Sequence, residues 1–233
     1  MNKKQWLGLG LVAVAAVGLA ACGNRASRSN SNSDAKTDLK AAIVTDTGGV
    51  DDKSFNQSAW EGLQEWGKEN GLSKDHGFTY FQSTNESEYA NNLEQAASSG
   101  YKAIFGIGFA LRNAVEAAAK DHSDINYVII DDEIKGQDNV ASALFADNEA
   151  AYLAGVAAAK TTKTKVVGFV GGIKGAVLTR FEKGFEAGVK SVDPSIKIDV
   201  QYAESFGDAA KGKTIAAAQY AAGADVIYQA AGG

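Results

Sequence analysis

Short apolar runs alternate with stretches of helical periodicity from Leu39 to Gln229, and this alternation leaves few folds open to the chain. The run 41–44 is typical of a buried strand, and Ala59, Leu63 and Trp66 then recur on one helical face. The same patterns predict strands at 78–81, 103–107, 127–130, 166–170, 196–201 and 225–229, and helices at 89–97, 111–120, 148–160, 177–185 and 208–222. Strands separated by single helices imply right-handed crossovers, so we predict an α/β fold with mostly parallel sheets.

The predicted elements fall into two similar series. The run 143–145 starts a crossing from the first series to the second, and residues 41–81 resemble 166–201 in their order of strand, glycine-containing turn, helix and strand. We therefore expect two ligand-binding lobes, residues 39–144 and 145–233. The second series stops directly after a strand, where further βα units and a return crossing would complete it. We expect this lobe to be truncated.

The first residues have the pattern of a lipoprotein signal peptide. Lys3 and Lys4 precede an apolar run at 6–21, and Cys22 follows Leu-Ala-Ala at the cleavage position. A transmembrane anchor is the alternative, but the run is shorter than the ~20 residues that a spanning helix needs. We predict a signal peptide at 1–21, lipidation (diacylglycerol, palmitate) of Cys22 and a flexible Ser- and Asn-rich tether at 22–38. The expected location is the extracytoplasmic face of the cell membrane.

Composition argues against several partners. The chain holds 23 Lys and Arg against 28 Asp and Glu, a net charge of -5, and its basic residues form no stripe. Because phosphate binding depends on clustered Lys and Arg, we expect no nucleic acid partner. A neutral or cationic small ligand fits the charge better.

No catalytic or metal-binding constellation is present in the sequence. The two histidines, His76 and His122, stand in charged stretches typical of exposed loops or helix ends. The Gly-Ile-Gly at 106–108 follows a predicted strand, but Leu111 replaces the third glycine of a dinucleotide fingerprint. The acidic residues at 46, 51 and 52 do not follow an EF-hand spacing. We therefore expect no enzyme activity, no metal and no cofactor.

The stretch 44–62 carries the strongest functional signal. It runs from a strand through an acidic glycine turn into an amphipathic helix, which places Asp46 and Phe55 beyond the carboxyl end of the strand. Small ligands bind there in open α/β sheets, beside the free N–H groups of the following helix. Turn formation and helix capping are the alternative roles for Asp46 and Asn56.

Several motifs in order along the chain resemble one protein family. They are VTDTGGVDDKSFNQSAWEG at 44–62, VASALF at 140–145 with Asn148-Glu149 after it, GFEAGVK at 184–190, Asp193-Pro194, SFGD at 205–208 and QAAGG at 229–233. This pattern resembles the basic membrane protein (BMP) family, the PnrA-like purine nucleoside-binding lipoproteins of ABC transporters. The resemblance implies a type I periplasmic-binding-protein-like fold with two doubly wound parallel-sheet lobes.

The resemblance also implies a set of ligand contacts. Carried over by position, Phe55 and Phe206 would hold a purine between their rings, although each could instead be a core residue. Asp46 and Asp131 would accept hydrogen bonds from the ligand, with Asn56 beside Phe55 and the backbone of Gly232 on the second lobe. Asp132 would replace Asp131 if the register is shifted by one residue. Further family contacts, an acidic residue and a lysine, fall after Gly233.

The resulting hypothesis is a monomeric, lipid-anchored substrate-binding protein that captures purine nucleosides and passes them to an ABC permease. The same fold holding a sugar or another small polar ligand remains an alternative, because fold does not determine function. A surface nucleoside hydrolase is a second alternative.

Overall fold

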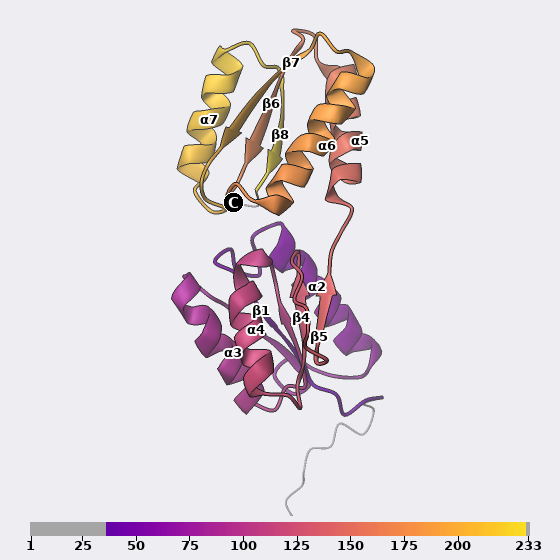
Figure 1. The fold of residues 1–233 in the computed structure, drawn as a ribbon, viewed down its shortest axis with the longest axis vertical. Coiled ribbons are helices and arrows are strands. Elements are labelled where there is room, and N and C mark those ends of the chain that lie inside the picture. The colour runs from indigo at the N-terminus through magenta and orange to yellow at the C-terminus, as the bar shows by residue number, and fades with distance from the viewer. Residues whose placement is uncertain (1–35, 232–233) are drawn as a thin grey trace, which may run out of the picture. The chain divides into compact units, whose positions relative to one another are not determined.

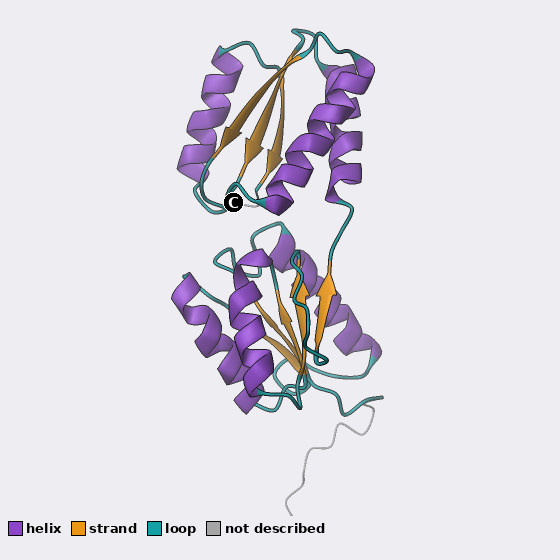
Figure 2. Ribbon diagram, viewed as in Figure 1, coloured by secondary structure: helices purple, strands orange, loops and turns teal. Residues whose placement is uncertain are grey.

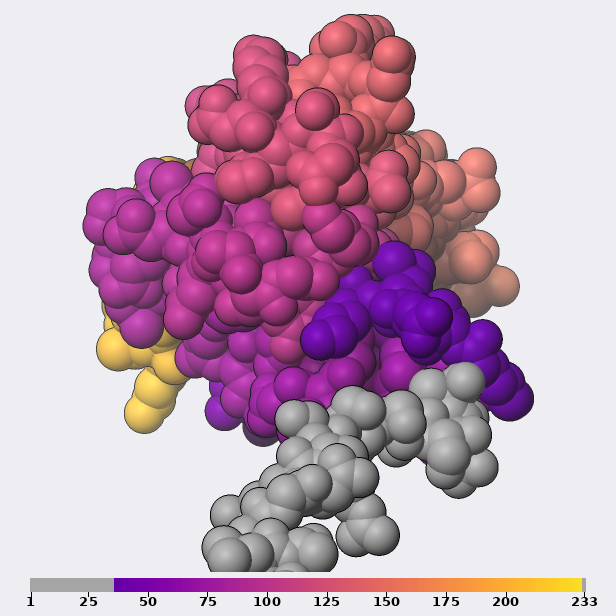
Figure 3. Space-filling model, turned by 90° about the horizontal axis from the view of Figure 1, so that it is seen from below, coloured from indigo at the N-terminus to yellow at the C-terminus, as the bar shows by residue number. Residues whose placement is uncertain are grey.

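The computed structural model describes residues 36–231, which fold as an α/β protein with two parallel sheets (Figures 1 and 2). The predicted signal peptide, Cys22 and Gly232 lie outside the described residues. Near the start of the described chain, the backbone N–H of Lys36 donates to the carbonyl oxygen of Asn70 at 2.8 Å. Figure 3 shows the start of the described chain, in indigo, lying against magenta segments that follow it in the sequence. Within residues 36–231, no helix is both long and apolar enough to cross a bilayer.

Five parallel strands form the first sheet, in the order β2-β1-β3-β4-β5. The strands are β1 (Ala41–Val44), β2 (Phe78–Phe81), β3 (Ala103–Gly106), β4 (Asn126–Ile130) and β5 (Val140–Ala143). The connecting helices are α2 (Phe55–Glu69), α3 (Tyr89–Ser98) and α4 (Arg112–Asp121), with short 3-10 helices η1 (Glu86–Glu88) and η2 (Phe109–Leu111). Because all strands are parallel, their carboxyl ends lie along one edge of the sheet, where ligands bind in such folds.

Strand β1 is buried on both faces, which explains its continuous apolar sequence. Ala42 and Val44 belong to the core that α3 and α4 cover. Ala41 and Ile43 belong to a separate core with Leu63 of α2. The helices therefore lie on both faces of the sheet, as in a doubly wound fold.

Three parallel strands form the second sheet, in the order β7-β6-β8. The elements are β6 (Val166–Gly171), β7 (Lys197–Tyr202), β8 (Val226–Ala230), α5 (Asp147–Thr161), α6 (Ala176–Val192) and α7 (Ala209–Ala221). Helices α5 and α6 cover one face, where Phe169 and Phe185 are fully buried. Helix α7 covers the other face through Ile215.

Helices α5 and α6 lie in backbone contact because glycines stand at their crossing. A Cβ added at Gly188 would lie 2.0 Å from the carbonyl oxygen of Tyr152, and one at Gly155 would lie 2.2 Å from that of Phe185. No side chain fits at either position. The close contact between the two helices fixes the position of α5, whose first residue is Asp147.

The predicted α/β class with parallel sheets is confirmed, and each predicted helix and strand overlaps an observed element, although α6 continues to Val192, beyond the expected 185. The prediction was incomplete at 140–143, where β5 pairs with β4 at the edge of the first sheet. The Val-Ala-Ser-Ala sequence has small side chains and is only partly buried, so it lacks the apolar run that marked the other strands. The predicted lobe boundary at 144 falls between β5 and α5 and stays a prediction.

Candidate functional site

The loop after β1 folds around the carboxylate of Asp46. Oδ1 of Asp46 accepts hydrogen bonds from the backbone N–H of Gly48 at 2.8 Å and from Nδ2 of Asn56 at 2.6 Å. A Cβ added at Gly48 would lie 3.0 to 3.2 Å from the side chains of Asn56, Asp46 and Asp52, so the loop fits closely around a glycine. Burial raises the pKa of Asp46, while the hydrogen bonds from Gly48 and Asn56 oppose that rise.

The side chain of Asn56 is engaged inside the loop. It is 1% exposed, and its Nδ2 donates both to Asp46 and, at 2.9 Å, to Oδ2 of Asp52. Its Oδ1 accepts from the backbone N–H of Asp46 at 3.3 Å. With both amide donors occupied, Asn56 holds the predicted ligand residue Asp46 in place.

Asp52 is a site residue that was not predicted from the sequence. Its Oδ1 accepts from the backbone N–H groups of Ser54 at 2.8 Å and Gln57 at 3.1 Å, and its Oδ2 accepts from that of Asn56 at 3.2 Å. The carboxylate thus satisfies the free donors at the start of α2, as a capping residue does. The signal was an Asp two residues before a Ser that precedes a helix.

Asp131 lies at the end of β4 in the left-handed backbone region, with φ of 70°. Its side chain lines a pocket of about 740 Å³ together with Phe55 and Asp147, while Asp132 does not line it. Burial, and next the negative charge of Asp147, raises the pKa of Asp131 to about 6, against the opposing charge of Arg180. The structure therefore favours Asp131 over Asp132 as the residue facing the pocket.

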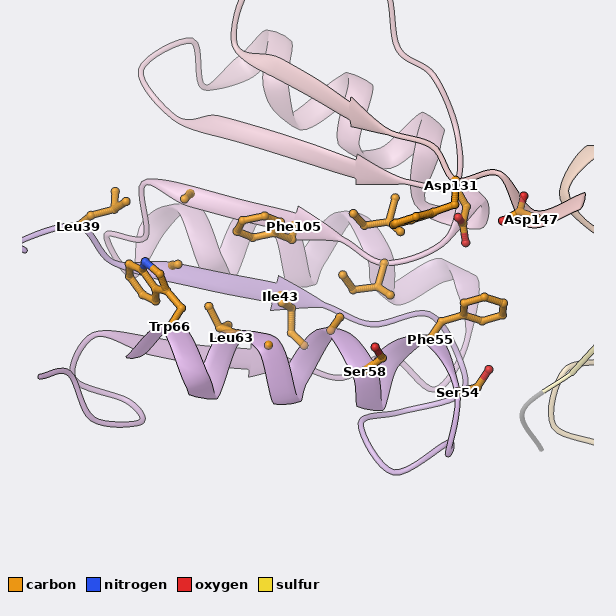
Figure 4. A pocket seen from close by; sticks show the side chains of 17 residues that line it. Leu39, Ile43, Ser54, Phe55, Ser58, Leu63, Trp66, Phe105, Asp131 and Asp147 are labelled. Atoms are coloured by element: carbon orange, nitrogen blue, oxygen red, sulfur yellow. The ribbon is translucent and has the colours of Figure 1, made fainter. Parts of the chain in front are cut away.

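The pocket has a polar end and a long apolar end (Figure 4). Ser54, Phe55, Asp131 and Asp147 lie where the strands end, and the apolar part runs between α2 and the sheet toward Trp66. Phe55 also packs against the core beneath α2. Its ring thus has a structural contact as well as a position at the pocket.

The ring of Phe206 packs against that of Phe109, a residue that was not predicted. Its ring centroid lies 6.1 Å from that of Phe109, at an interplanar angle of 66°. A Cβ added at Gly172 would lie 2.4 Å from two ring carbons of Phe206, so the ring rests on the glycine turn after β6. No ring contact joins Phe206 to Phe55 among residues 36–231. Phe109 was missed, and the available signal was an aromatic residue directly after Gly-Ile-Gly at the end of a strand.

A sequence profile of one family, described as ABC transporter substrate-binding protein PnrA-like, matches residues 39–233. The chain is 59% identical over 231 residues to the ABC transporter nucleoside-binding protein BmpA of Lactococcus lactis subsp. cremoris, a match covering 99% of this chain and 66% of that protein. It is 51% identical over 236 residues to a CD4+ T-cell-stimulating antigen of Listeria innocua, covering 100% of this chain and 66% of that protein. The chain thus spans about 66% of the length of these curated relatives.

A crystal structure of ABC transporter solute-binding proteins from Aeropyrum pernix K1 resembles this structure with a TM-score of 0.75 and 29% sequence identity. The match covers 83% of this chain and 55% of that chain. This similarity confirms the predicted periplasmic-binding-protein-like fold.

Proposed function

The chain belongs to the family of PnrA-like ABC transporter substrate-binding proteins, and from this membership we propose that it binds purine nucleosides outside the cell for delivery to an ABC permease. Inosine, guanosine and adenosine are the expected ligands. The protein would bind and release its ligand unchanged.

One observation carries the proposal: aromatic rings and carboxylates stand at the carboxyl ends of the strands. Phe55 lies at the polar end of the pocket with Asp131, and Phe206 follows β7 of the second sheet. A nucleobase offers two faces for stacking, and each aromatic contact contributes ~1 to 3 kcal/mol without reading the base edge. Carboxylates such as Asp46 and Asp131 accept hydrogen bonds from ribose hydroxyls and base N–H groups.

Isothermal titration calorimetry with inosine, guanosine, adenosine, uridine and a panel of sugars tests the ligand class. We expect saturable binding of the three purine nucleosides and weaker binding of uridine. Phe55→Ala and Phe206→Ala should each lower purine affinity by about 5-fold to 150-fold, the loss of one stacking contact. Tyr152→Ala, which removes a partly exposed aromatic ring on α5, serves as the matched control.

Two results would contradict this ligand assignment. Binding of a sugar in place of nucleosides would favour the sugar alternative. Unchanged purine affinity in both phenylalanine variants would show that the base binds elsewhere. Release of free hypoxanthine from inosine during the titration would instead favour the hydrolase alternative.

Membrane attachment through Cys22 is part of the proposal. The sequence pattern before Cys22 supports a lipid anchor. The family membership supports an extracytoplasmic location for residues 39–233. Metabolic labelling with an alkyne-tagged palmitate followed by cell fractionation tests it. The native chain should carry label in the membrane fraction, and Cys22→Ser should carry none.

Ligand capture would involve closure of the two lobes around the nucleoside. A ligand shifts such an equilibrium only by its differential contacts with the two states. Phe206 and the glycine turn after β6 would supply those contacts from the second lobe. Small-angle scattering of the protein with and without inosine should show a decrease in radius of gyration on binding, and an unchanged radius would argue against closure.

A further inference from the structure

Asp147 and Arg180 form an ion pair between α5 and α6, outside the set of ligand contacts proposed above. Nε of Arg180 donates to Oδ2 of Asp147 at 2.7 Å, and Nη2 lies 2.5 Å from the same oxygen. Asp147 is the first residue of α5, and its side chain is only 6% exposed. The pair therefore holds a buried carboxylate directly after the crossing from the first sheet.

The guanidinium of Arg180 contacts Asp147 through two nitrogens. Its Nη2 is buried, and its short contact with Oδ2 of Asp147 is an ion pair rather than a well-aligned hydrogen bond. The positive charge of Arg180 is therefore held directly at the carboxylate of Asp147.

Asp131 is an electrostatic partner of this pair. It is 6% exposed, and no hydrogen bond of its carboxylate is found within residues 36–231. Asp131 and Asp147 line the same end of the pocket, with both carboxyl groups drawn at that end in Figure 4. The charges that act on Asp131 are those of Asp147 on α5 and Arg180 on α6, and Asp147 in turn acts on Tyr228 of β8.

We propose that Arg180 is a positioning residue of the ligand site, which holds Asp147 and keeps Asp131 in its ionised, hydrogen-bond-accepting form. This inference rests on the proposed function, because it assigns Arg180 a role in the site where Asp131 would meet the ligand. Two buried carboxylates at one pocket end repel each other, and the guanidinium that is paired with Asp147 offsets part of that repulsion. Without Arg180, Asp131 would be protonated over a wider pH range and would accept fewer hydrogen bonds.

An ion pair that only joins two helices makes a different prediction. Its removal would lower stability and leave the titration of Asp131 where it was. The pH dependence of Asp131 therefore separates a positioning role from a structural one.

The test is a carboxyl ¹³C NMR titration of Asp131 in the full chain without ligand, assigned with Asp131→Asn. We expect Arg180→Gln to move the titration midpoint upward by about 0.5 pH unit or more, as loss of a nearby positive charge requires. Arg180→Lys should stay closer to the native midpoint because it keeps the charge. Lys183→Gln, which removes an exposed charge from the same helix, is the matched control and should leave the midpoint unchanged.

Asp147→Asn should shift the titration midpoint of Asp131 in the opposite direction. A general loosening of the fold would shift the midpoint the same way in both variants, so the pair of variants distinguishes the two causes. Asp147→Asn removes the repelling charge and frees the guanidinium, so the midpoint of Asp131 should fall. Thermal melts identify any variant that does not fold. An Arg180→Gln midpoint equal to the native one, or midpoints that move the same way in both variants, would overturn the inference.

A second arm separates this inference from the proposed function. Inosine affinity is measured by calorimetry between pH 5 and pH 8 in the native protein and in Arg180→Gln. If the native protein binds no nucleoside, the proposed function fails while the NMR arm still decides the role of Arg180. If it binds, inosine affinity should fall as the pH is lowered and Asp131 becomes protonated. This fall should begin at a higher pH in Arg180→Gln than in the native protein, and coincident pH profiles would contradict the inference.

Discussion

Asn56→Asp tests whether the loop after β1 depends on one buried amide. The substitution keeps the shape of the side chain and replaces a donor with an acceptor. Nδ2 of Asn56 donates to Asp46 at 2.6 Å and to Asp52 at 2.9 Å. In the variant both contacts join two carboxylates at hydrogen-bond distance, so two attractive interactions become repulsive.

The expected cost follows from these two contacts. A hydrogen bond to a charged group contributes ~1.5 to 3 kcal/mol, so losing two costs about 3 to 6 kcal/mol before any repulsion. A whole domain is stable by only about 5 to 15 kcal/mol. We therefore expect a large drop in the urea midpoint at pH 7.5, together with loss of the Asp46 geometry at the site.

The sign of the pH dependence makes the prediction specific. A carboxyl group between two carboxylates binds a proton more tightly in the folded protein than in the unfolded chain. The folded state of the variant therefore gains protons relative to the unfolded state, and its stability deficit should shrink as pH falls from 7.5 to 5.

Urea unfolding of the native protein, Asn56→Asp and Asn113→Asp at both pH values provides the assay. Asn113 is an exposed asparagine on α4 and serves as the matched control. A deficit no larger than that of Asn113→Asp, or one that does not shrink at pH 5, would refute the role assigned to Asn56.

Three further substitutions test other parts of the structure. Gly172→Ala should displace Phe206 and lower nucleoside affinity, measured by calorimetry, with little loss of stability. Gly175→Ala is the control, because a Cβ there meets open space, and it should change neither nucleoside affinity nor stability. Asp131→Asn should raise the unfolding free energy by about 2 to 3 kcal/mol at pH 7.5 and by roughly half as much at pH 5 in urea titrations. The cost of the charged form is lost progressively as pH falls from the folded pKa of about 6 toward the unfolded pKa of about 3.9. Gly188→Ala should lower the melting temperature in calorimetric scans because its Cβ would meet a backbone carbonyl oxygen at 2.0 Å, and an unchanged melting temperature would argue against the close helix pair.

The order of elements was predictable because local patterns determine it. Ala41–Val44 is buried on both faces and has no polar residue, and α2 repeats its apolar residues at helical spacing. Strand β5 has neither signal, since its small residues lie at a sheet edge. Its position is set by pairing with β4, a contact that only the assembled sheet provides.

The site was predictable where its residues are close in sequence. Asp46 and Asn56 lie in one loop, and their contact follows from the turn and the helix that bound it. Phe109 and Phe206 come together from distant segments, as do Asp147 and Arg180 on different helices. Neither pairing leaves a local sequence pattern, so both required the folded chain.

The acidic residues of the site differ in how many hydrogen bonds their carboxylates accept, and this difference indicates where a ligand would bind. Asp52 accepts four hydrogen bonds inside the loop, including three from backbone N–H groups at the start of α2. Asp131 accepts none within residues 36–231, and burial raises its pKa. A ligand that donates hydrogen bonds to Asp131 would remove that cost and so stabilise the folded protein as it binds.

A nucleoside that donates hydrogen bonds to Asp131 should therefore raise the melting temperature of the protein more at pH 7.5 than at pH 5, where Asp131 is largely protonated. Differential scanning fluorimetry with inosine at both pH values measures this. 2′,3′-Dideoxyinosine, which lacks the 2′- and 3′-hydroxyls of inosine, is the control that removes these two donors and keeps the base. If the two ligands stabilise the protein equally at both pH values, ribose donation to Asp131 contributes nothing to binding, and the base alone would account for recognition.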